Sequence, residues 1–163
     1  MNRKASFYGI IFLALSIIGY LGVRTYRIQE SKSKALLKVS QLPDLGQYFD
    51  SSIQLTGKAV IVNYFHPDCE HCEYMIKKII ENKEKLKLKK LLMISPASKP
   101  TINEFVNKYR LDSFPFIHIS RDSSLNFAKV FGSDFLPSFY IYDAEHNLDT
   151  IINGETKIAN LLK

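Results

Sequence analysis

The sequence predicts an α/β domain, with a mixed central β-sheet flanked by α-helices, preceded by one N-terminal transmembrane helix. Three observations support this prediction. Residues 5–23 are uncharged and mainly apolar, short β-branched segments alternate with amphipathic segments through residues 42–163, and the two cysteines stand close together after one of these apolar segments. With 163 residues, of which 46% are hydrophobic, the chain is long enough for one compact domain with a hydrophobic core.

The formal net charge of +6 comes from the N-terminal part of the chain. Residues 1–40 contain seven of the 22 basic residues and one of the 16 acidic residues, so residues 41–163 hold fifteen of each. Non-specific binding to nucleic acids requires net positive charge on the docking surface. We therefore expect no nucleic-acid partner.

The apolar segment near the N-terminus is long enough to cross a membrane as a helix. Residues 5–23 are bracketed by Arg3 and Lys4 on one side and by Arg24 and Arg27 on the other. About 20 predominantly apolar residues span the hydrocarbon core of a bilayer, and no charge inside this run has to be desolvated. The segment therefore predicts a membrane-embedded helix.

This helix divides the chain into three predicted parts. Residues 1–24 form a cytoplasmic tip and a transmembrane signal-anchor, residues 25–41 form a polar juxtamembrane linker, and residues 42–163 form the folded domain. A cleaved signal peptide is the alternative, but residues 20–24 offer no convincing small-x-small cleavage site.

The first part of the folded domain predicts a strand, a tight turn and a helix in succession. Residues 42–58 predict turns and a short strand. The β-branched and apolar run at residues 59–65 is typical of a strand that is buried on both faces. Pro67 ends this strand, and from Glu70 onward apolar residues recur at helical spacing.

The remaining segments predict a mixed sheet covered by helices. Residues 123–131 predict a short helix that is capped by Ser123 or Ser124. The other predicted elements are strands at 91–95, 114–120, 139–142 and 148–152, a turn at 143–147, and helices at 101–111 and 156–162.

The two cysteines lie at the junction between the predicted strand and helix, in the order Cys69-Glu70-His71-Cys72. This spacing brings both sulfurs to the first helical turn, where free backbone N–H groups and the positive end of the helix dipole favour a thiolate at Cys69. A thiolate is the attacking species in disulfide exchange, and Cys72 can then attack the mixed disulfide. The sequence therefore predicts catalytic Cys69 and Cys72 that form a redox-active Cys69–Cys72 disulfide.

Charged neighbours are expected to tune this pair. A protonated His71 would stabilise the Cys69 thiolate and make the couple more oxidising. The negative charges of Asp68, Glu70 and Glu73 would favour the protonated thiol instead. The net sign is left open by the sequence.

The cysteine pair also allows three other interpretations. The pair could form an inert structural disulfide or two buried thiols. Cys69 and Cys72 could bind copper or zinc together with His66 or His71, in a metal carrier. A peroxiredoxin-type peroxidase is less consistent with the sequence, because it needs a lone peroxidatic cysteine in a loop that contains Thr and Pro. We expect no metal and no cofactor.

With the strand, the Cys69–Cys72 motif, the helix and the late Leu136-Pro137 in view, the chain resembles the thioredoxin superfamily. Within it, the run Gly57–Phe65 is similar to the entry strand of TlpA/ResA-like thiol-disulfide oxidoreductases, which carry a redoxin-type domain. The resemblance covers residues 42–163 and implies the thioredoxin-like fold and protein disulfide oxidoreductase activity.

The resemblance also implies roles for further residues. Cys69 would be the nucleophile and Cys72 the resolving thiol. Pro137 would be a cis-proline that faces the disulfide, and Leu136 would pair through its backbone with an extended substrate. Pro67, in the turn before Cys69, is expected to belong to the same docking surface.

The chain departs from the family at several positions. Asp68 stands where relatives usually have Trp, and Asn63 stands where thioredoxins carry a buried Asp. Proton transfer is therefore expected to use Glu70 or water. Glu70 is similar to the ResA type and His71 to the oxidase or isomerase type, so the direction of electron flow is left open.

The chemistry also suggests a location. Dithiol pairs suit oxidising compartments, and a single N-terminal apolar segment commonly directs the following domain out of the cytoplasm. We expect a single-pass protein of a bacterial-type inner membrane, with residues 24–163 on the periplasmic side. Its expected partners are secreted protein thiols or disulfides, such as those of cytochrome c maturation, and a membrane or periplasmic redox partner.

Overall fold

The computed structural model describes residues 3–50 and 52–162, without the side chains of residues 3–12, 14, 28 and 31–35. The chain divides into two compact units, residues 1–37 and residues 38–163. Helix α1 (Arg3–Val39) contains the described residues of the first unit, and its last two residues belong to the second. Within the described residues, no helix reaches the length and apolarity of a membrane span. Part of the predicted span, the side chains of residues 5–12 and 14, lies outside the described residues, so the span stays a prediction.

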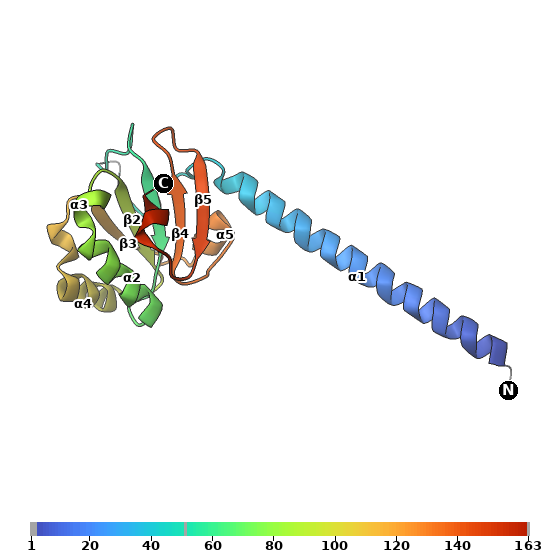
Figure 1. Ribbon diagram of the computed structural model, residues 1–163. Helices are drawn as coiled ribbons and strands as arrows, with labels where there is room; N and C mark the ends of the chain where they lie inside the picture. Colours follow the sequence, from blue (N-terminus) through green and yellow to red (C-terminus); the bar gives the residue numbers. More distant parts are fainter. Residues whose placement is uncertain (1–2, 51, 163) are drawn as a thin grey trace. The chain divides into compact units, whose positions relative to one another are not determined.

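A five-stranded mixed sheet forms the centre of the second unit, as the sequence predicts (Figure 1). Its strand order is β3-β2-β1-β4-β5. The three strands from the first part of the domain run parallel to one another, and the last two run antiparallel to their neighbours. The strands are β1 (Val60–Tyr64), β2 (Lys90–Ser95), β3 (Ile117–Arg121), β4 (Ser138–Tyr142) and β5 (Leu148–Asn153).

Helices cover both faces of this sheet. The elements are α2 (Glu70–Glu81), α3 (Lys83–Leu86), α4 (Lys99–Tyr109), the 3-10 helix η1 (Leu111–Ser113), α5 (Phe127–Phe131) and α6 (Ile158–Leu161). Helices α2, α3, α4 and α6 contribute to the apolar cluster on one face, and α5 contributes to the cluster on the other.

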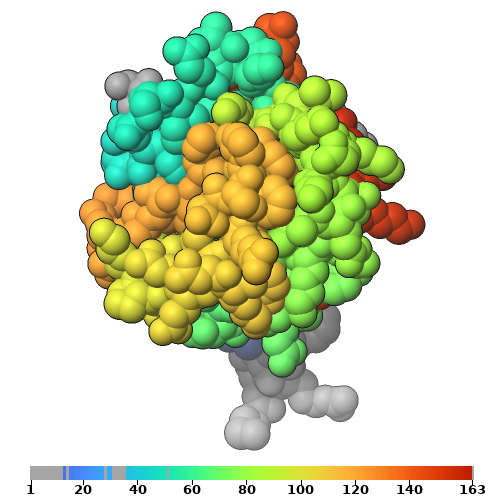
Figure 2. Space-filling view, turned by 90° about the vertical axis from the view of Figure 1, so that its left-hand side faces the viewer, coloured from blue at the N-terminus to red at the C-terminus, as the bar shows by residue number. Residues whose placement is uncertain are grey.

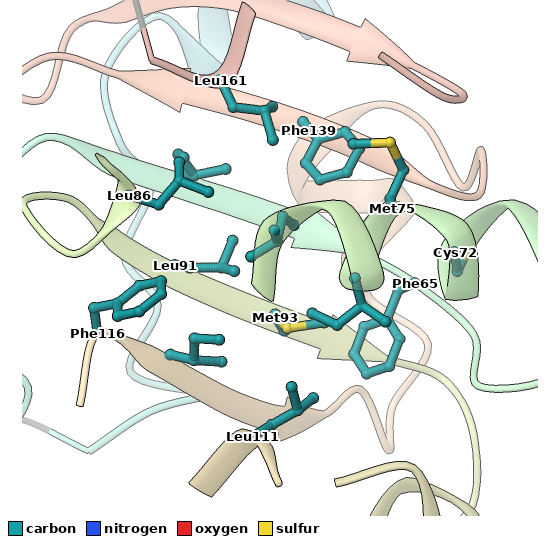
Figure 3. Packing of buried hydrophobic residues seen from close by; sticks show 14 of the residues in the cluster. Phe65, Cys72, Met75, Leu86, Leu91, Met93, Leu111, Phe116, Phe139 and Leu161 are labelled. Atoms are coloured by element: carbon teal, nitrogen blue, oxygen red, sulfur yellow. The ribbon is translucent and has the colours of Figure 1, made fainter. Parts of the chain in front are cut away.

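The alternation of side chains along β1 divides the core into these two clusters. Ile61 belongs to the cluster beneath α2, whereas Val60 and Val62 belong to the cluster beneath α5. Figure 3 shows Cys72 and Met75 of α2 directed into the first cluster, with Met75 next to Phe139 of β4. Burial of this apolar surface fixes α2, and with it the cysteine motif, against the sheet.

The register of the central strands brings two distant segments to one end of the sheet. Tyr64, the last residue of β1, pairs with Ser138, the first residue of the antiparallel β4. The loop that follows Tyr64 leads to Cys69, and the residue that precedes Ser138 is Pro137. The cysteine motif and the Leu136-Pro137 segment therefore lie at the same end of the sheet.

Two local expectations were wrong. Residues 42–58 contain no strand within their described part. Instead, Gln41 forms an isolated bridge with Asn147, and Asp44 and Asp50 hold turns by accepting hydrogen bonds from nearby backbone amides. Figure 2 shows this segment (cyan) at the surface, above the yellow and orange surface of the chain around residues 100–120.

The second error concerns the helix predicted at residues 123–131. Helix α5 begins only at Phe127, and neither Ser123 nor Ser124 caps it. The buried carboxylate of Asp122 accepts hydrogen bonds from the backbone N–H groups of Asn126 and Phe127, each at 2.9 Å. The capping group therefore comes from the end of β3, and the intervening serines lie in a turn.

Candidate active site

Cys69 is the N-cap residue of α2. Its backbone is extended (φ −93°, ψ 115°), and its Sγ accepts a hydrogen bond from the backbone N–H of Cys72 at 3.4 Å. Its own N–H donates to the carbonyl of His66, and its carbonyl accepts from the N–H of Glu73. A sulfur in this position occupies the place of the usual Ser or Asp oxygen, at the positive end of the helix dipole.

Cys72 differs from Cys69 in its surroundings. It is 3% exposed and lies in the apolar cluster beneath α2, whereas Cys69 is half-buried. Burial, followed by the neighbouring Cys69 thiol, raises the pKa of Cys72 to about 12. Both residues are free thiols in this structure. The pair therefore combines an accessible sulfur at the helix start with a protonated sulfur beneath it.

The Leu136–Pro137 peptide bond is cis, as the resemblance implies. The Pro137 carbonyl accepts a hydrogen bond from the N–H of Gly154 at 2.7 Å, and the next carbonyl, of Ser138, accepts from the Asn63 side chain at 3.0 Å. These bonds fix the segment before β4 to β1 and to the end of β5. The docking roles of Leu136, Pro137 and the half-buried Pro67 stay predictions.

The predicted tuning residues have different surroundings. The Nδ1 atom of His71 lies 2.6 Å from Oε1 of Glu155, a residue in the loop between β5 and α6. The backbone N–H of Asp68 donates to Nδ1 of His66 at 3.2 Å, while the Asp68 side chain is 77% exposed. Glu70 is exposed. His71 is therefore held by a carboxylate that the sequence analysis did not identify.

Glu73, one helical turn after Cys69, belongs to a group of charged and polar side chains that joins α2 to α4. Its Oε1 lies 2.9 Å from Nζ of Lys77 and 3.1 Å from Nζ of Lys108, and it accepts a hydrogen bond from the Tyr109 hydroxyl at 2.5 Å. The Tyr109 hydrogen bond, followed by those from the two lysines, lowers the pKa of Glu73 to about 2. These lysines offset the negative charge that was expected to oppose a thiolate.

Asn63 replaces a buried acid with a neutral amide. It is 3% exposed, and its Nδ2 donates to the carbonyls of Ser138, at 3.0 Å, and Tyr64, at 3.4 Å. The side chain thus joins β1 to β4 beneath the Pro137 segment. An amide side chain does not ionise near neutral pH, so Asn63 serves as a structural donor.

The metal-carrier alternative finds no ligand set in the described part of the chain. No group of three or more His, Cys, Asp or Glu side chains within it is arranged to hold a metal ion. The Nδ1 atoms of His66 and His71 are directed at the Asp68 amide and at Glu155, respectively.

The comparisons with known proteins agree with this architecture. The chain is similar to a secreted disulfide oxidoreductase of Mycobacterium tuberculosis, with 19% identity, 66% of this chain and 80% of that chain covered, and a TM-score of 0.57. It is also similar to DsbF of M. tuberculosis (21% identity, 66% and 78% covered, TM-score 0.57). A third similar structure is a thioredoxin-family thiol:disulfide interchange protein of Chlorobium tepidum (18% identity, 66% and 77% covered, TM-score 0.56).

One curated relative is described as "Probable protein disulfide-isomerase A4" of Caenorhabditis elegans, and it is 24% identical over 103 residues. This match covers 58% of the chain but only 17% of that much longer protein. No family model matches the chain. The similarity to these solved structures extends over 66% of the chain in each case. The chain therefore has the thioredoxin-like fold.

Proposed function

We propose that the chain is a protein thiol-disulfide oxidoreductase that uses Cys69 and Cys72. The observation that carries this proposal is the asymmetry of the pair, because Cys69 accepts a hydrogen bond at the start of α2 while Cys72 lies buried beneath it. Disulfide exchange needs an accessible nucleophilic thiolate and a second thiol that can reach the mixed disulfide. The similarity to disulfide oxidoreductases supports this proposal.

The reaction, written in the reducing direction, begins with attack of the Cys69 thiolate on a substrate disulfide. A bond forms between Cys69 Sγ and one substrate sulfur, and the other substrate sulfur leaves with the bonding electrons and takes up a proton. Cys72 then loses its proton to water or to Glu70 and attacks Cys69 Sγ, which releases the second substrate thiolate. Two electrons pass from the cysteine pair to the substrate, and the Cys69–Cys72 disulfide remains. The oxidising direction is the reverse.

The burial of Cys72 determines the order of these two steps. Because its pKa is raised to about 12, Cys72 is protonated near neutral pH and does not compete with Cys69 for the substrate. It becomes a nucleophile only when the mixed disulfide brings an electrophilic sulfur next to it. With Asn63 unable to accept the proton, water or Glu70 takes this role.

We further propose that the domain acts outside the cytoplasm, held by a membrane anchor at residues 5–23. The uncharged run between basic residues supports the anchor. One similar structure is described as secreted, and another as an exposed lipoprotein thioredoxin of Streptococcus pneumoniae. The proposed substrates are secreted proteins with cysteines, apocytochromes c among them. Sedimentation of the full chain with membranes would test the anchor. Protection of the C-terminal domain from thiol reagents that are applied on the cytoplasmic side of the membrane would test the location.

The Cys69→Ser and Cys72→Ser variants test the proposed activity as a matched pair. In Cys72→Ser, the Cys69 thiolate can still attack a substrate disulfide but the mixed disulfide cannot be resolved, so the variant is expected to accumulate covalent adducts with a disulfide-bonded model substrate such as insulin. In Cys69→Ser, adducts and insulin reduction are both expected to be lost. Equal trapping by the two variants, or insulin reduction by either of them at the wild-type rate, would refute the proposal.

A further inference from the structure

The loop between β5 and α6 presents Glu155 to the cysteine motif from a fixed position. The N–H of Gly154, which precedes Glu155, donates to the carbonyl of Pro137 at 2.7 Å. The N–H of Thr156, which follows it, donates to Sδ of Met75 at 3.4 Å. The loop is thus attached on one side to the Pro137 segment and on the other to α2, and Glu155 lies between these two attachments.

From this position Glu155 reaches His71, one of the two residues between the cysteines. Its Oε1 lies 2.6 Å from Nδ1 of His71, which precedes Cys72 in the motif. The distance is short for a hydrogen bond that involves a charged group. A carboxylate 84 residues away in the chain is therefore paired with the imidazole that stands within the cysteine motif.

We propose that Glu155 is a positioning residue that holds the His71 imidazole and offsets its charge next to the Cys69–Cys72 pair. This inference rests on the proposed function. An unpaired imidazolium in the motif would stabilise the Cys69 thiolate, and hence the reduced pair, which makes the couple more oxidising. The Glu155 carboxylate cancels that charge. It therefore keeps the couple more reducing than the sequence of the motif alone would make it.

A purely stabilising role does not account for this pair. The side chains of His71 and Glu155 are 69% and 43% exposed, and an ion pair so exposed contributes little to the free energy of folding. Glu73 is already compensated by Lys77 and Lys108. The charge near the motif thus depends on His71 and its partner, together with His66 and the exposed acids Asp68 and Glu70.

The test measures the thiol–disulfide equilibrium of the full chain with glutathione. It compares the wild type with Glu155→Gln, His71→Gln and the double variant. The measurements are made at about pH 5.5, where an ordinary histidine is charged. Glu155→Gln is expected to favour the reduced protein by about threefold, which for a two-electron couple raises the potential by about 14 mV. Alkylation of Cys69 by iodoacetamide is expected to accelerate by about the same factor, because more of the sulfur is ionised.

Two controls separate this effect from general changes in charge or folding. Glu145→Gln removes an exposed carboxylate from the turn between β4 and β5, at the opposite end of β4 from Pro137, and is expected to leave both measurements unchanged. In the His71→Gln background, the further change Glu155→Gln is expected to have no effect. Thermal unfolding of each variant reports on the fold.

The outcomes distinguish this inference from the proposed function. If the wild type forms a reversible Cys69–Cys72 disulfide but Glu155→Gln matches it in both measurements, the inference is wrong and the proposed function stands. An equal shift with and without His71 also refutes the inference, because Glu155 would then act on the sulfurs directly. If the wild type forms no reversible disulfide, the proposed function fails, and the inference fails with it.

Discussion

The backbone N–H of Cys72 donates to Sγ of Cys69 over 3.4 Å, so the buried cysteine supports the sulfur that it is proposed to attack later. The two thiols are thus unequal before any substrate binds. One accepts a backbone hydrogen bond at the start of α2, and the other is kept protonated by the apolar cluster in which it lies. This inequality leads to the first prediction.

In the reduced protein near neutral pH, iodoacetamide is expected to modify Cys69 and leave Cys72 unmodified. Cys72 is 3% exposed and its pKa is raised to about 12, so both access and ionisation oppose its reaction. Mass spectrometry of proteolytic peptides after timed alkylation measures this selectivity. In guanidinium chloride the two residues should react alike, and modification of native Cys72 as fast as that of Cys69 would contradict the assignment of roles.

Glu73→Gln is expected to lower the free energy of unfolding near neutral pH. The pKa of Glu73 is lowered from 4.5 to about 2, so its contribution is present above the pKa of the unfolded chain and is lost as the pH falls toward about 2. The difference between variant and wild type should therefore shrink between about pH 5 and pH 2. Urea denaturation at a series of pH values measures it.

Glu81→Gln, on the same helix, is the control for this experiment. Among the described residues, the ion-pair partner of Glu81 is Lys78, on the surface of α2. A smaller loss is expected from it than from Glu73→Gln, which releases Lys77, Lys108 and Tyr109 together. Equal losses of unfolding free energy in the two variants would show that the contacts of Glu73 with α4 stabilise the protein no more than an ordinary surface ion pair does.

Asp122→Ala is expected to lower the free energy of unfolding by about 2 kcal/mol, the upper part of the range for loss of a helix cap. Its carboxylate is 1% exposed and accepts the N–H groups of Asn126 and Phe127, which would be left without these bonds in a buried position. Asp143→Ala is the matched control, because Asp143 also accepts two backbone N–H groups but in an exposed turn. Urea denaturation should give a clearly smaller loss for Asp143→Ala, and the reverse order would refute this account.

Gly154→Ala is expected to destabilise the protein by about 1 to 2 kcal/mol and to reduce its disulfide-exchange rate. Gly154 has φ +87°, a conformation that costs an L-residue about this much, and its amide is bonded to Pro137 next to the proposed docking surface. Gly57→Ala imposes a similar strain, at φ +67°, in the turn before β1, where an added Cβ meets open space. Similar losses of stability, with slower insulin reduction only in Gly154→Ala, are expected. Equal exchange rates in the two variants would contradict the role given to this loop.

The parts of the fold that depend on local patterns could be predicted from the sequence. The strand at β1, the helix that starts at Glu70 and the dithiol between them follow from neighbouring residues, because burial on both faces and helical periodicity leave a signal within about ten positions. The structure confirms the mixed sheet and its covering helices.

The parts that depend on distant contacts could not be predicted. Glu155 meets His71 across 84 residues and Tyr109 meets Glu73 across 36, and neither acid differs in sequence from an ordinary surface residue. The cap of α5 was missed for a different reason, since Asp122 comes before a turn that delays the helix beyond the serines. An acidic residue at the end of a buried strand, followed by a polar turn, is the signal that could have identified it.

The arrangement of the site also has a consequence for biosynthesis. The cysteines emerge from the ribosome before residues 136–155, so the reactive sulfur exists as part of a nascent chain before β4 can pair with β1 and before Glu155 can reach His71. During that interval β1 can pair with β2, but its other edge has no partner strand. A newly made molecule thus has its thiols before it has the proposed docking surface beside them, and early oxidation by small oxidants would compete with completion of the sheet.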